Sequence, residues 1–269
     1  MQKKILTIED LSAVGKTSLA TAIPIITAFG HESIAIPSAL LSANTAFKGF
    51  TYLDLTGELL KILTHLNELN VKPDALYTGY LGSAHQINII LDYLNSHEGI
   101  NYYLDPAMAD DGCFYEGFDE KFSLEIKKLI KKALVIMPNI TEAKLLLNSN
   151  SSDALDLLKP LANLGPRYVI ITGIKKANRV FNYGYDKKED KTFSFSYNIL
   201  ANSYYGTGDL FASLITGAME KGLSFEKALK LAGDFLHKAI ALSNENKVPV
   251  EYGVLFEPLL SVLGGENNE

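Results

Sequence analysis

The sequence predicts an α/β protein in which helices cover both faces of a mostly parallel central sheet. Short runs rich in β-branched residues alternate with stretches whose apolar residues recur every three or four positions. The short runs are apolar throughout rather than alternating, which is typical of strands buried on both faces. Their regular succession with the helical stretches indicates parallel strand–helix–strand units.

The elements follow one another without a linker or an internal repeat. The expected strands cover residues 5–8, 33–37, 75–79, 101–105, 134–138 and 168–172, and helical spacing is clearest at 55–69 and 83–97. Residues 179–198 differ, because two aromatic runs flank the charged sequence DKKED, which predicts an antiparallel hairpin. Helical patterns at 209–222 and 224–245 follow, with Ser224 as the expected N-cap and a frayed tail at 264–269. We therefore expect a single domain over residues 1–269.

The composition excludes several classes of function. With 47% hydrophobic and 21% charged residues, the 269-residue chain has the balance of a globular protein. The net charge of -6 and the lack of a basic patch argue against nucleic acid as a partner, and the lysines of 127–132 fit the solvated face of a helix. The single cysteine, Cys113, fits a reducing compartment. Since neither a signal peptide nor a membrane-spanning run is present, we expect a cytoplasmic protein with no membrane partner.

Polar residues follow the expected strands at the edge where parallel sheets bind ligands. They are Glu9, Asp10, Ser42 to Thr45, Gly79, Tyr80, Asp105, Asp110, Asn139, Glu142 and Thr172. This concentration of acidic and hydroxyl groups predicts a functional site there.

The sequence GKTS at 15–18 suggests a phosphate-binding P-loop, because it follows a strand and opens a helix. A P-loop requires glycine five residues before Gly15, and that position holds Asp10. A carboxylate there would lie against the phosphates, and its Cβ would hinder the tight turn. The preferred interpretation is a glycine turn followed by a helix start.

A second glycine turn, at 204–213, carries more chemical information. Gly206 and Gly208 flank Thr207, and Asp209 begins an apolar helix. Glycines let backbone N–H groups face a ligand, and the helix N-terminus favours anions, so these three residues form a candidate anion hole. Asp209 is placed to accept a proton from an attacking hydroxyl group. The alternative is a capped helix after a glycine turn.

Two further segments supply candidate ligands for magnesium. DPAMADDG (105–112) and PNITEAKLL (138–146) each follow an expected strand. Magnesium is commonly held by one or two carboxylates together with phosphate oxygens, a role that suits Asp105 and Glu142. As an alternative, Asn139 or Thr141 simply caps the helix that begins there.

In their chain order, GTGDLFAS, PNITEAKLL, DPAMAD and TGYLGSAHQ resemble the pyridoxal kinases of the ribokinase-like superfamily. The bacterial pyridoxamine/pyridoxal kinase branch is similar also in IEDLSAVGKTS and LSANT. The resemblance runs from about residue 4 to about residue 258. GTGD with PNxxE is specific to the superfamily, and GYLGSA narrows the resemblance to pyridoxal kinases.

The resemblance implies one three-layer α/β domain without a separate lid domain, a homodimer, and the use of ATP and Mg²⁺, with a monovalent cation left open. It implies that Asp209 is the catalytic base. The other implied site residues are Gly206, Thr207 and Gly208 in the anion hole, Asp105, Asp110, Asn139, Glu142 and Thr172 near the nucleotide and its metal, and Asp10, Thr45, Tyr80 and Tyr205 near the small-molecule substrate.

Departures from the family pattern leave the substrate open. Asp10 stands where many relatives have serine, Tyr205 where a small apolar residue is common, and Ala107 and Ala109 interrupt the usual DPVMGD. The first hypothesis is phosphorylation of the 5′-hydroxymethyl group of pyridoxal, pyridoxamine or pyridoxine. The second is a hydroxymethylpyrimidine or phosphomethylpyrimidine kinase of the same fold, many of which carry cysteine at the position of Asp209. The third, from another class, is a P-loop nucleotide-binding module without phosphotransfer.

Overall fold

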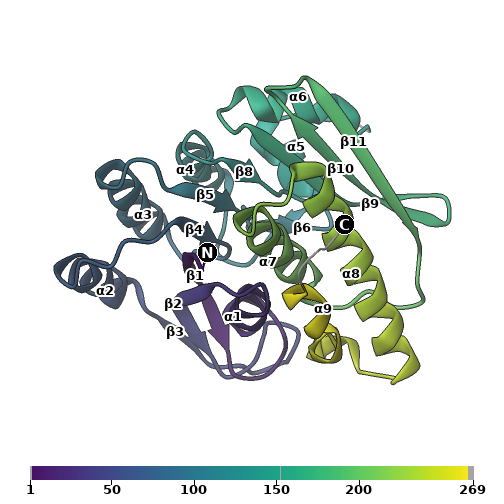
Figure 1. The fold of residues 1–269 in the computed structure, drawn as a ribbon, viewed down its shortest axis with the longest axis horizontal. Coiled ribbons are helices and arrows are strands. Elements are labelled where there is room, and N and C mark those ends of the chain that lie inside the picture. Colours follow the sequence, from purple (N-terminus) through teal and green to yellow (C-terminus); the bar gives the residue numbers. More distant parts are fainter. Residues whose placement is uncertain (1, 152, 266–269) are drawn as a thin grey trace.

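The central layer of the computed structural model, which describes residues 2–151 and 153–265, is a sheet of nine strands. These strands are β1 (Lys4–Ser12), β2 (Glu32–Leu41), β3 (Tyr52–Asp54), β4 (Ala75–Thr78), β5 (Asn101–Leu104), β8 (Val135–Ile136), β9 (Tyr168–Lys176), β10 (Arg179–Asp186) and β11 (Lys191–Asn198). Their order in the sheet is β11-β10-β9-β8-β5-β4-β1-β2-β3 (Figure 1). A separate two-stranded ribbon pairs β6 (Ala109–Asp110) with β7 (Cys113–Phe114).

Every strand pair from β9 through β8, β5, β4 and β1 to β2 is parallel. The antiparallel pairs lie at the two edges, where β10 and β11 form the predicted hairpin beside β9, and β3 pairs with β2. The α/β fold class with a mostly parallel sheet is therefore confirmed. The short strands β3, β6 and β7 were not predicted, because runs of two or three residues carry no periodicity.

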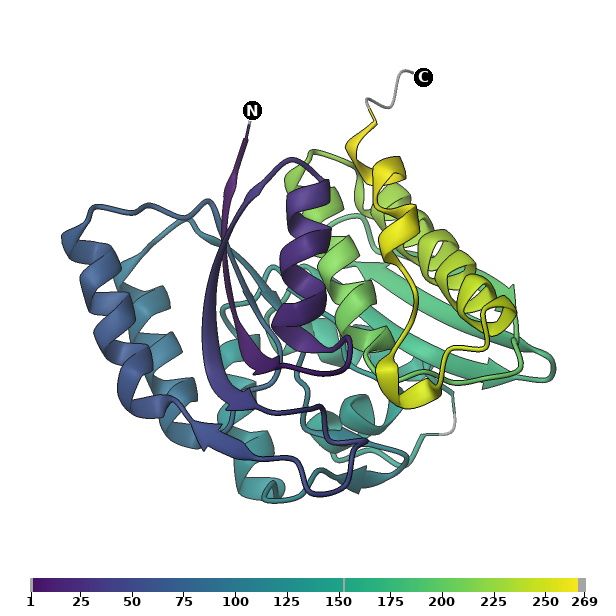
Figure 2. The ribbon, with the colours of Figure 1, turned by 90° about the horizontal axis from the view of Figure 1, so that it is seen from below.

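Helices cover both faces of this sheet (Figure 2). They are α1 (Ser18–Ala28), α2 (Thr56–Glu68), α3 (Ala84–Ser96), α4 (Glu120–Ile130), α5 (Ile140–Leu147), α6 (Leu155–Asn163), α7 (Thr207–Glu220), α8 (Phe225–Glu245) and α9 (Ser261–Gly264). Two 3₁₀ turns, at Val250–Tyr252 and Glu257–Leu259, precede α9. The described residues form one three-layer domain, without a separate lid domain.

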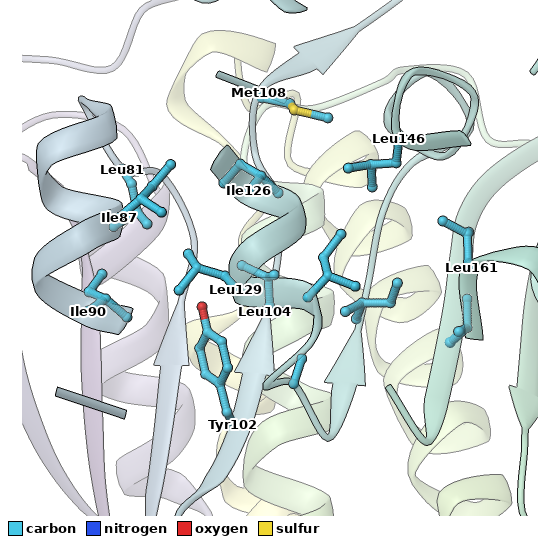
Figure 3. Close-up of a cluster of buried hydrophobic side chains, with 14 of the residues drawn as sticks. Leu81, Ile87, Ile90, Tyr102, Leu104, Met108, Ile126, Leu129, Leu146 and Leu161 are labelled. Atoms are coloured by element: carbon cyan, nitrogen blue, oxygen red, sulfur yellow. The ribbon is translucent and has the colours of Figure 1, made fainter. Parts of the chain in front are cut away.

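Each face has its own hydrophobic core. Helices α2 to α6 pack on one face, where Leu104 and Tyr102 of β5 meet Ile126 and Leu129 of α4 (Figure 3). Helices α1, α7 and α8 pack on the other. Strand β1 serves both cores, since Leu6 and Ile8 face the first and Ile5 faces the second. This division explains why the strands read as continuous apolar runs.

The C-terminal helices α7 and α8 agree with the prediction to within two residues at their starts. Ser224 caps α8, as expected, by accepting a hydrogen bond from the backbone N–H of Lys227. Helix α7 begins two residues earlier than predicted, at Thr207. Most of the predicted frayed tail lies outside the described residues. Among the described residues, no helix is both long and apolar enough to cross a membrane.

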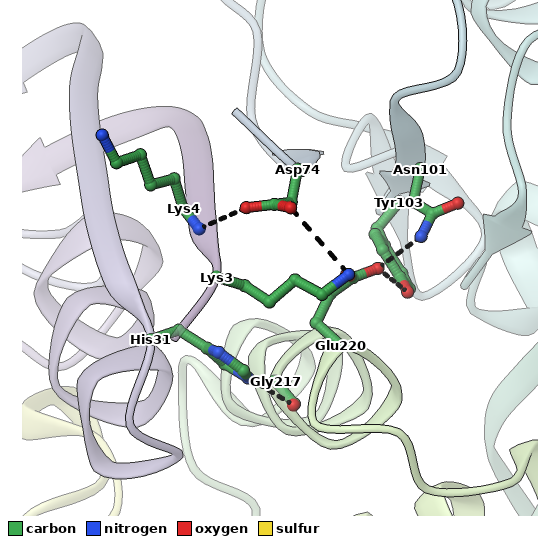
Figure 4. A network of polar contacts seen from close by, with 8 residues as sticks. All are labelled: Lys3, Lys4, His31, Asp74, Asn101, Tyr103, Gly217 and Glu220. Carbon is green, nitrogen blue, oxygen red and sulfur yellow. Dashed lines mark hydrogen bonds and ion pairs between the residues drawn. The ribbon is translucent and has the colours of Figure 1, made fainter. Parts of the chain in front are cut away.

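The far end of α7 is anchored in the sheet by Glu220 (Figure 4). This carboxylate is buried and accepts hydrogen bonds from Asn101 Nδ2 at 2.8 Å and from the Tyr103 hydroxyl at 2.7 Å. Its other oxygen pairs with Lys3 Nζ at 3.3 Å. One turn earlier, the carbonyl of Gly217 accepts a hydrogen bond from His31 Nε2 at 3.1 Å. The C-terminal end of the helix is thereby fixed to β5, to Lys3 just before β1 and to His31 just before β2.

Candidate active site

A cavity of about 1610 Å³ opens where β5, β8 and β9 meet the N-terminus of α7. Its wall includes all but two of the residues predicted for the site: Thr45, Asp105, Asp110, Asn139, Glu142, Thr172, Tyr205, Gly206, Thr207, Gly208 and Asp209. The other two, Asp10 and Tyr80, lie outside this wall. The position agrees with the rule that parallel sheets bind ligands at the carboxyl ends of their strands.

The candidate anion hole lies at the start of α7. Gly206 is the residue before the helix and has a φ of 74°, a conformation that favours glycine. A Cβ at this position would lie 1.9 Å from the carbonyl oxygen of Lys16, so a side chain is excluded sterically as well. The first N–H groups of an α-helix have no partner within the helix, and here they belong to Thr207, Gly208 and Asp209. They are available to an anion in the cavity.

Asp209 is partly buried and lines this cavity. Burial raises the pKa of its carboxyl to about 6, a hydrogen bond from the backbone N–H of Ser18 lowers it, and the charge of Asp10 raises it. At neutral pH a carboxyl with this pKa is mostly ionised and can accept a proton. Its pKa lies nearer to the working pH than that of an ordinary aspartate, which suits a general base.

Two more carboxyl groups lie close to Asp209 on the sheet side. Asp105, at the end of β5, is 9% exposed, and burial together with the charges of Glu142 and Asp209 raises its pKa well above the usual range. Glu9 of β1 is fully buried, and within the described residues neither of its carboxylate oxygens has a hydrogen-bond partner. Its pKa is also raised, first by burial and then by the charge of Asp209.

This acidic cluster suits a cation. Asp105 forms no salt bridge within the described part of the chain, so its buried carboxylate lacks a basic partner. Residues 2–151 and 153–265 contain no group of three or more acidic, histidine or cysteine side chains arranged to hold a metal by themselves. A Mg²⁺ ion bound here would therefore take further oxygens from phosphate and water, as it commonly does.

Asn139 and Glu142 form a complete capping box at the start of α5. The Asn139 side chain accepts a hydrogen bond from the Glu142 N–H at 3.0 Å, and Glu142 Oε2 accepts one from the Asn139 N–H at 2.9 Å. Glu142 Oε1 accepts two more, from the N–H groups of Met108 at 3.0 Å and Ala109 at 3.4 Å. Burial still raises the pKa of Glu142 to about 8. The capping alternative for Asn139 is thus observed, and the same pair holds the segment after β5 in place.

The ribbon of β6 and β7 brings Asp110 to the cavity. Asp110 is exposed and accepts a hydrogen bond from the N–H of Asp111 at 2.9 Å. The Thr141 hydroxyl accepts one from the N–H of Gly112 at 3.0 Å, which fixes the ribbon to α5. Thr172 lies opposite Asn139 through a parallel bridge. The ribbon and β9 therefore both contact the start of α5, and both contribute residues to the cavity wall.

The residues predicted for the small-molecule substrate are more dispersed. Thr45 and Tyr205 are exposed on the cavity wall. Tyr80 is half-buried, with its ring 5.6 Å from that of Phe118. Asp10 is 7% exposed and accepts hydrogen bonds from the hydroxyl groups of Ser12 at 3.2 Å and Ser18 at 2.5 Å. These bonds hold Asp10 against the turn before α1, and its role toward a substrate stays a prediction.

The GKTS segment is a glycine turn followed by a helix start, as predicted. Asp10 belongs to β1, so the loop between strand and helix is too short for a P-loop. The ammonium group of Lys16 pairs with Glu257 at 2.8 Å and lies over the ring of Phe256. It is therefore engaged outside the cavity.

Sequence reasoning assigned no role to the carbonyl of Lys16, which adjoins the anion hole at Gly206. This contact is made by a backbone atom, so no side-chain pattern could indicate it. Glu9 was expected at this edge of the sheet, but without a role. The sequence feature that could have indicated a site role is its carboxylate, which stands beside Asp10 in an otherwise apolar part of the strand.

The chain is similar to proteins of one kinase family. The phosphomethylpyrimidine kinase family matches residues 23–254. A Bacteroides thetaiotaomicron protein, described as a candidate phosphomethylpyrimidine kinase and solved with pyridoxal, is 34% identical, with a TM-score of 0.93 over 100% of this chain and 98% of that one. The pyridoxal kinase of Lactobacillus plantarum is 30% identical, with a TM-score of 0.91 over 98% and 97%. The hydroxymethylpyrimidine/phosphomethylpyrimidine kinase of Bacillus subtilis is 27% identical over 69% of this chain and 70% of its own.

Proposed function

Because the chain belongs to the phosphomethylpyrimidine kinase family, we propose that it transfers the γ-phosphoryl group of ATP to the 5′-hydroxymethyl group of a B6 vitamer. Membership confirms the resemblance to ribokinase-like kinases that GTGD and PNxxE predicted. More broadly, the chain is a ribokinase-like kinase of a B6 vitamer or of hydroxymethylpyrimidine.

One observation carries the assignment of phosphotransfer. Asp209, with its pKa raised to about 6, lies at the N-terminus of α7 directly after the turn of Gly206 to Gly208, and the same cavity contains Asp105. A base for a hydroxyl proton, free N–H groups for an anion and an acidic group for a cation are the parts that phosphoryl transfer to an alcohol needs.

In this mechanism the Asp209 carboxylate accepts the proton of the attacking hydroxyl group. The N–H groups at the start of α7 stabilise negative charge on the transferring phosphoryl group, a contribution of roughly 100- to 1,000-fold for one such donor. Asp105 and Glu142, which both line the cavity, would hold a bound Mg²⁺, and the ion would neutralise phosphate charge. Asp110, Asn139 and Thr172 also line the cavity, and in this proposal they contact the nucleotide.

Two features favour a B6 vitamer over a pyrimidine. GYLGSA at 79–84 resembles the pyridoxal kinases, and Asp209 occupies a position where many hydroxymethylpyrimidine kinases carry cysteine. A relative that is 34% identical over the full chain has been solved with pyridoxal. The second candidate, a hydroxymethylpyrimidine or phosphomethylpyrimidine kinase, is favoured by the name of the family itself and by the Bacillus subtilis relative.

A coupled assay of ATP consumption would test the proposal. The alcohols are pyridoxal, pyridoxamine, pyridoxine and hydroxymethylpyrimidine, each with and without Mg²⁺, and Asp209→Asn is the inactive control. We expect kcat/KM to be highest for one of the three vitamers. A higher kcat/KM for hydroxymethylpyrimidine would support the second candidate, and ATP consumption that no alcohol stimulates would contradict both.

A further inference from the structure

A short turn near the C-terminus joins three loops that are far apart in the sequence. It is the 3₁₀ turn Val250–Tyr252, called the C-terminal turn below, and each of its three carbonyl oxygens accepts a hydrogen bond from a different loop. The donors, in the order of the carbonyls, are the N–H of Tyr205 at 3.4 Å, the side-chain amide of Asn44 at 2.9 Å and the N–H of Lys16 at 3.2 Å. The turn therefore connects the loops before α7, after β2 and before α1.

Asn44 is the donor that uses its side chain, and it is only 4% exposed. While its Nδ2 donates to the Glu251 carbonyl, its Oδ1 accepts a hydrogen bond from the N–H of Ala46 at 3.0 Å. Its backbone N–H donates to the Val14 carbonyl at 2.9 Å. Both ends of the buried amide are thus bound, one within its own loop and one on the C-terminal turn, as expected of a buried polar group.

The packing around Asn44 supports the same contact. The ring of Phe47, from the loop of Asn44, lies edge-on against the ring of Tyr252, with 5.1 Å between centroids. Gly15 leaves the space that the amide needs, because a Cβ at this position would lie 2.2 Å from Asn44 Nδ2. The glycine that gives GKTS its P-loop appearance therefore accommodates a side chain from another loop.

The C-terminal turn lies one residue away from the cavity wall at Asn44 and directly on it at Tyr205. Thr45, which follows Asn44, lines the cavity, and so does Tyr205. Both were predicted to lie near the small-molecule substrate, although they come from loops more than 150 residues apart. The hydrogen bonds of the turn thus tie together two separate parts of the predicted alcohol site.

We propose that Asn44 is a positioning residue for the alcohol: its bond to the Glu251 carbonyl holds the loop of Thr45 against the C-terminal turn, which also holds Tyr205. This inference rests on the proposed function, in which both residues lie near the alcohol. It gives a segment close to the C-terminus a part in binding the substrate without touching it. The base and the anion hole lie elsewhere on the wall, so the effect of Asn44 falls on the affinity for the alcohol rather than on the chemical step.

The first test separates the bond to the turn from the bond within the loop. Asn44→Ala loses both, whereas Asn44→Asp keeps an oxygen for the N–H of Ala46 and loses the donor for Glu251. At pH 8, in both variants, we expect the KM for the alcohol to rise about 3- to 10-fold, as for the loss of one hydrogen bond. We expect kcat and the KM for ATP to change less than about twofold, since uniform binding is lost. The alcohol is the one with the highest kcat/KM for wild type.

The matched control removes a buried hydrogen bond elsewhere in the fold. The hydroxyl groups of Tyr102 and Thr78 lie 2.8 Å apart, and Tyr102 belongs to the core between the sheet and helices α2 to α6. Tyr102→Phe should lower Tm but leave both KM values within about twofold of wild type. A general loss of stability is thereby distinguished from a loss of positioning.

A second pair of variants tests the same contact if the Asn44 variants do not fold. Phe47→Ala and Tyr252→Ala each remove the ring contact between loop and turn, and Tyr252 is 48% exposed, so the second change is readily tolerated. Each should raise the KM for the alcohol several-fold. The double variant should be no worse than the poorer single variant, because both changes remove one interaction.

Each outcome decides the proposal. A wild-type KM for the alcohol in Asn44→Asp, an equal rise in the KM for ATP, or an equal rise in Tyr102→Phe would overturn it. If the Asn44 variants do not fold, additive rises in the Phe47 and Tyr252 variants, or none, would overturn it. An inactive wild type would refute the proposed function and the positioning role together, whereas an active wild type with unaffected variants would refute the positioning role only.

Discussion

Lowering the pH from about 8 to about 6 is expected to stabilise the metal-free protein through Glu142. Its carboxyl is buried, and its pKa is raised from 4.5 to about 8. Because the folded state binds this proton more tightly than the unfolded state, the stabilisation is complete below the unfolded pKa. It is lost as the pH rises through the folded pKa.

The size of the effect follows from the two pKa values. Glu142 alone makes the free energy of unfolding about 2 kcal/mol larger at pH 6 than at pH 8. Asp209 adds about 0.4 kcal/mol in the same direction. His31 acts in the opposite direction, because burial lowers its pKa, and it removes at most about 0.8 kcal/mol at pH 6. Glu9 and Asp105, both with raised pKa, reinforce the trend.

The assay is thermal unfolding in a metal chelator at both pH values. For a chain of this size, 2 kcal/mol corresponds to a difference of about 4–8 °C in Tm. The variant Glu142→Gln cannot titrate at this position and should lose most of the difference, whereas Glu98→Gln, at an exposed site, should keep it. Equal pH differences in wild type and Glu142→Gln would refute the assignment of the raised pKa to Glu142.

The remaining predictions concern turnover and assembly. Asp209→Asn should still bind ATP but lose roughly 100- to 10,000-fold in turnover; retention of more than about a third of wild-type turnover would contradict the base assignment. Glu142→Gln should raise the Mg²⁺ concentration for half-maximal rate, and an unchanged titration would leave it a capping role only. Sedimentation at micromolar concentration should give about twice the monomer mass, and a monomer at every concentration would reject the dimer. Asp10→Ser should lower kcat/KM for pyridoxamine several-fold more than for pyridoxal, because a carboxylate can pair with a cationic vitamer; equal losses would contradict a substrate role for Asp10.

The parallel core of the fold could be predicted because its signal is repeated. Each buried strand from β1 to β9 carries a run of apolar residues, and the helices between them keep their spacing. Strand β8 was predicted over 134–138 but covers only Val135–Ile136, and the pairing continues beyond it only as single contacts, a hydrogen bond from the Thr172 N–H to the Pro138 carbonyl and an isolated bridge between Asn139 and Thr172. Strand β3 is exposed along its whole length, so it lacks the apolar pattern that marks a strand.

The location of the cavity and most of its lining side chains could be predicted, because most of these side chains follow the ends of strands. Asp105, Asn139, Glu142 and Asp209 come from distant parts of the sequence, and the topology brings them to one edge. The sequence could not indicate which backbone N–H groups these side chains bind, or where the backbone takes an unusual conformation. The three N–H groups bound by Glu142, and the φ of Ser18, depend on tertiary packing that no local pattern encodes.

Helix α7 shows why backbone packing matters to the proposed chemistry. Its N-terminus supplies the candidate anion hole and base, and the carbonyl of Lys16 packs against Gly206 at that end. Its other end is held by Glu220, through Tyr103 of β5 and Lys3 beside β1 (Figure 4). A site that must hold its groups within about 0.5 Å needs support from rigid elements. Since Glu220 fixes the far end of α7 to β5, the strand that ends next to Asp105, the packing of α7 on the sheet sets the distance between the base and the acidic cluster.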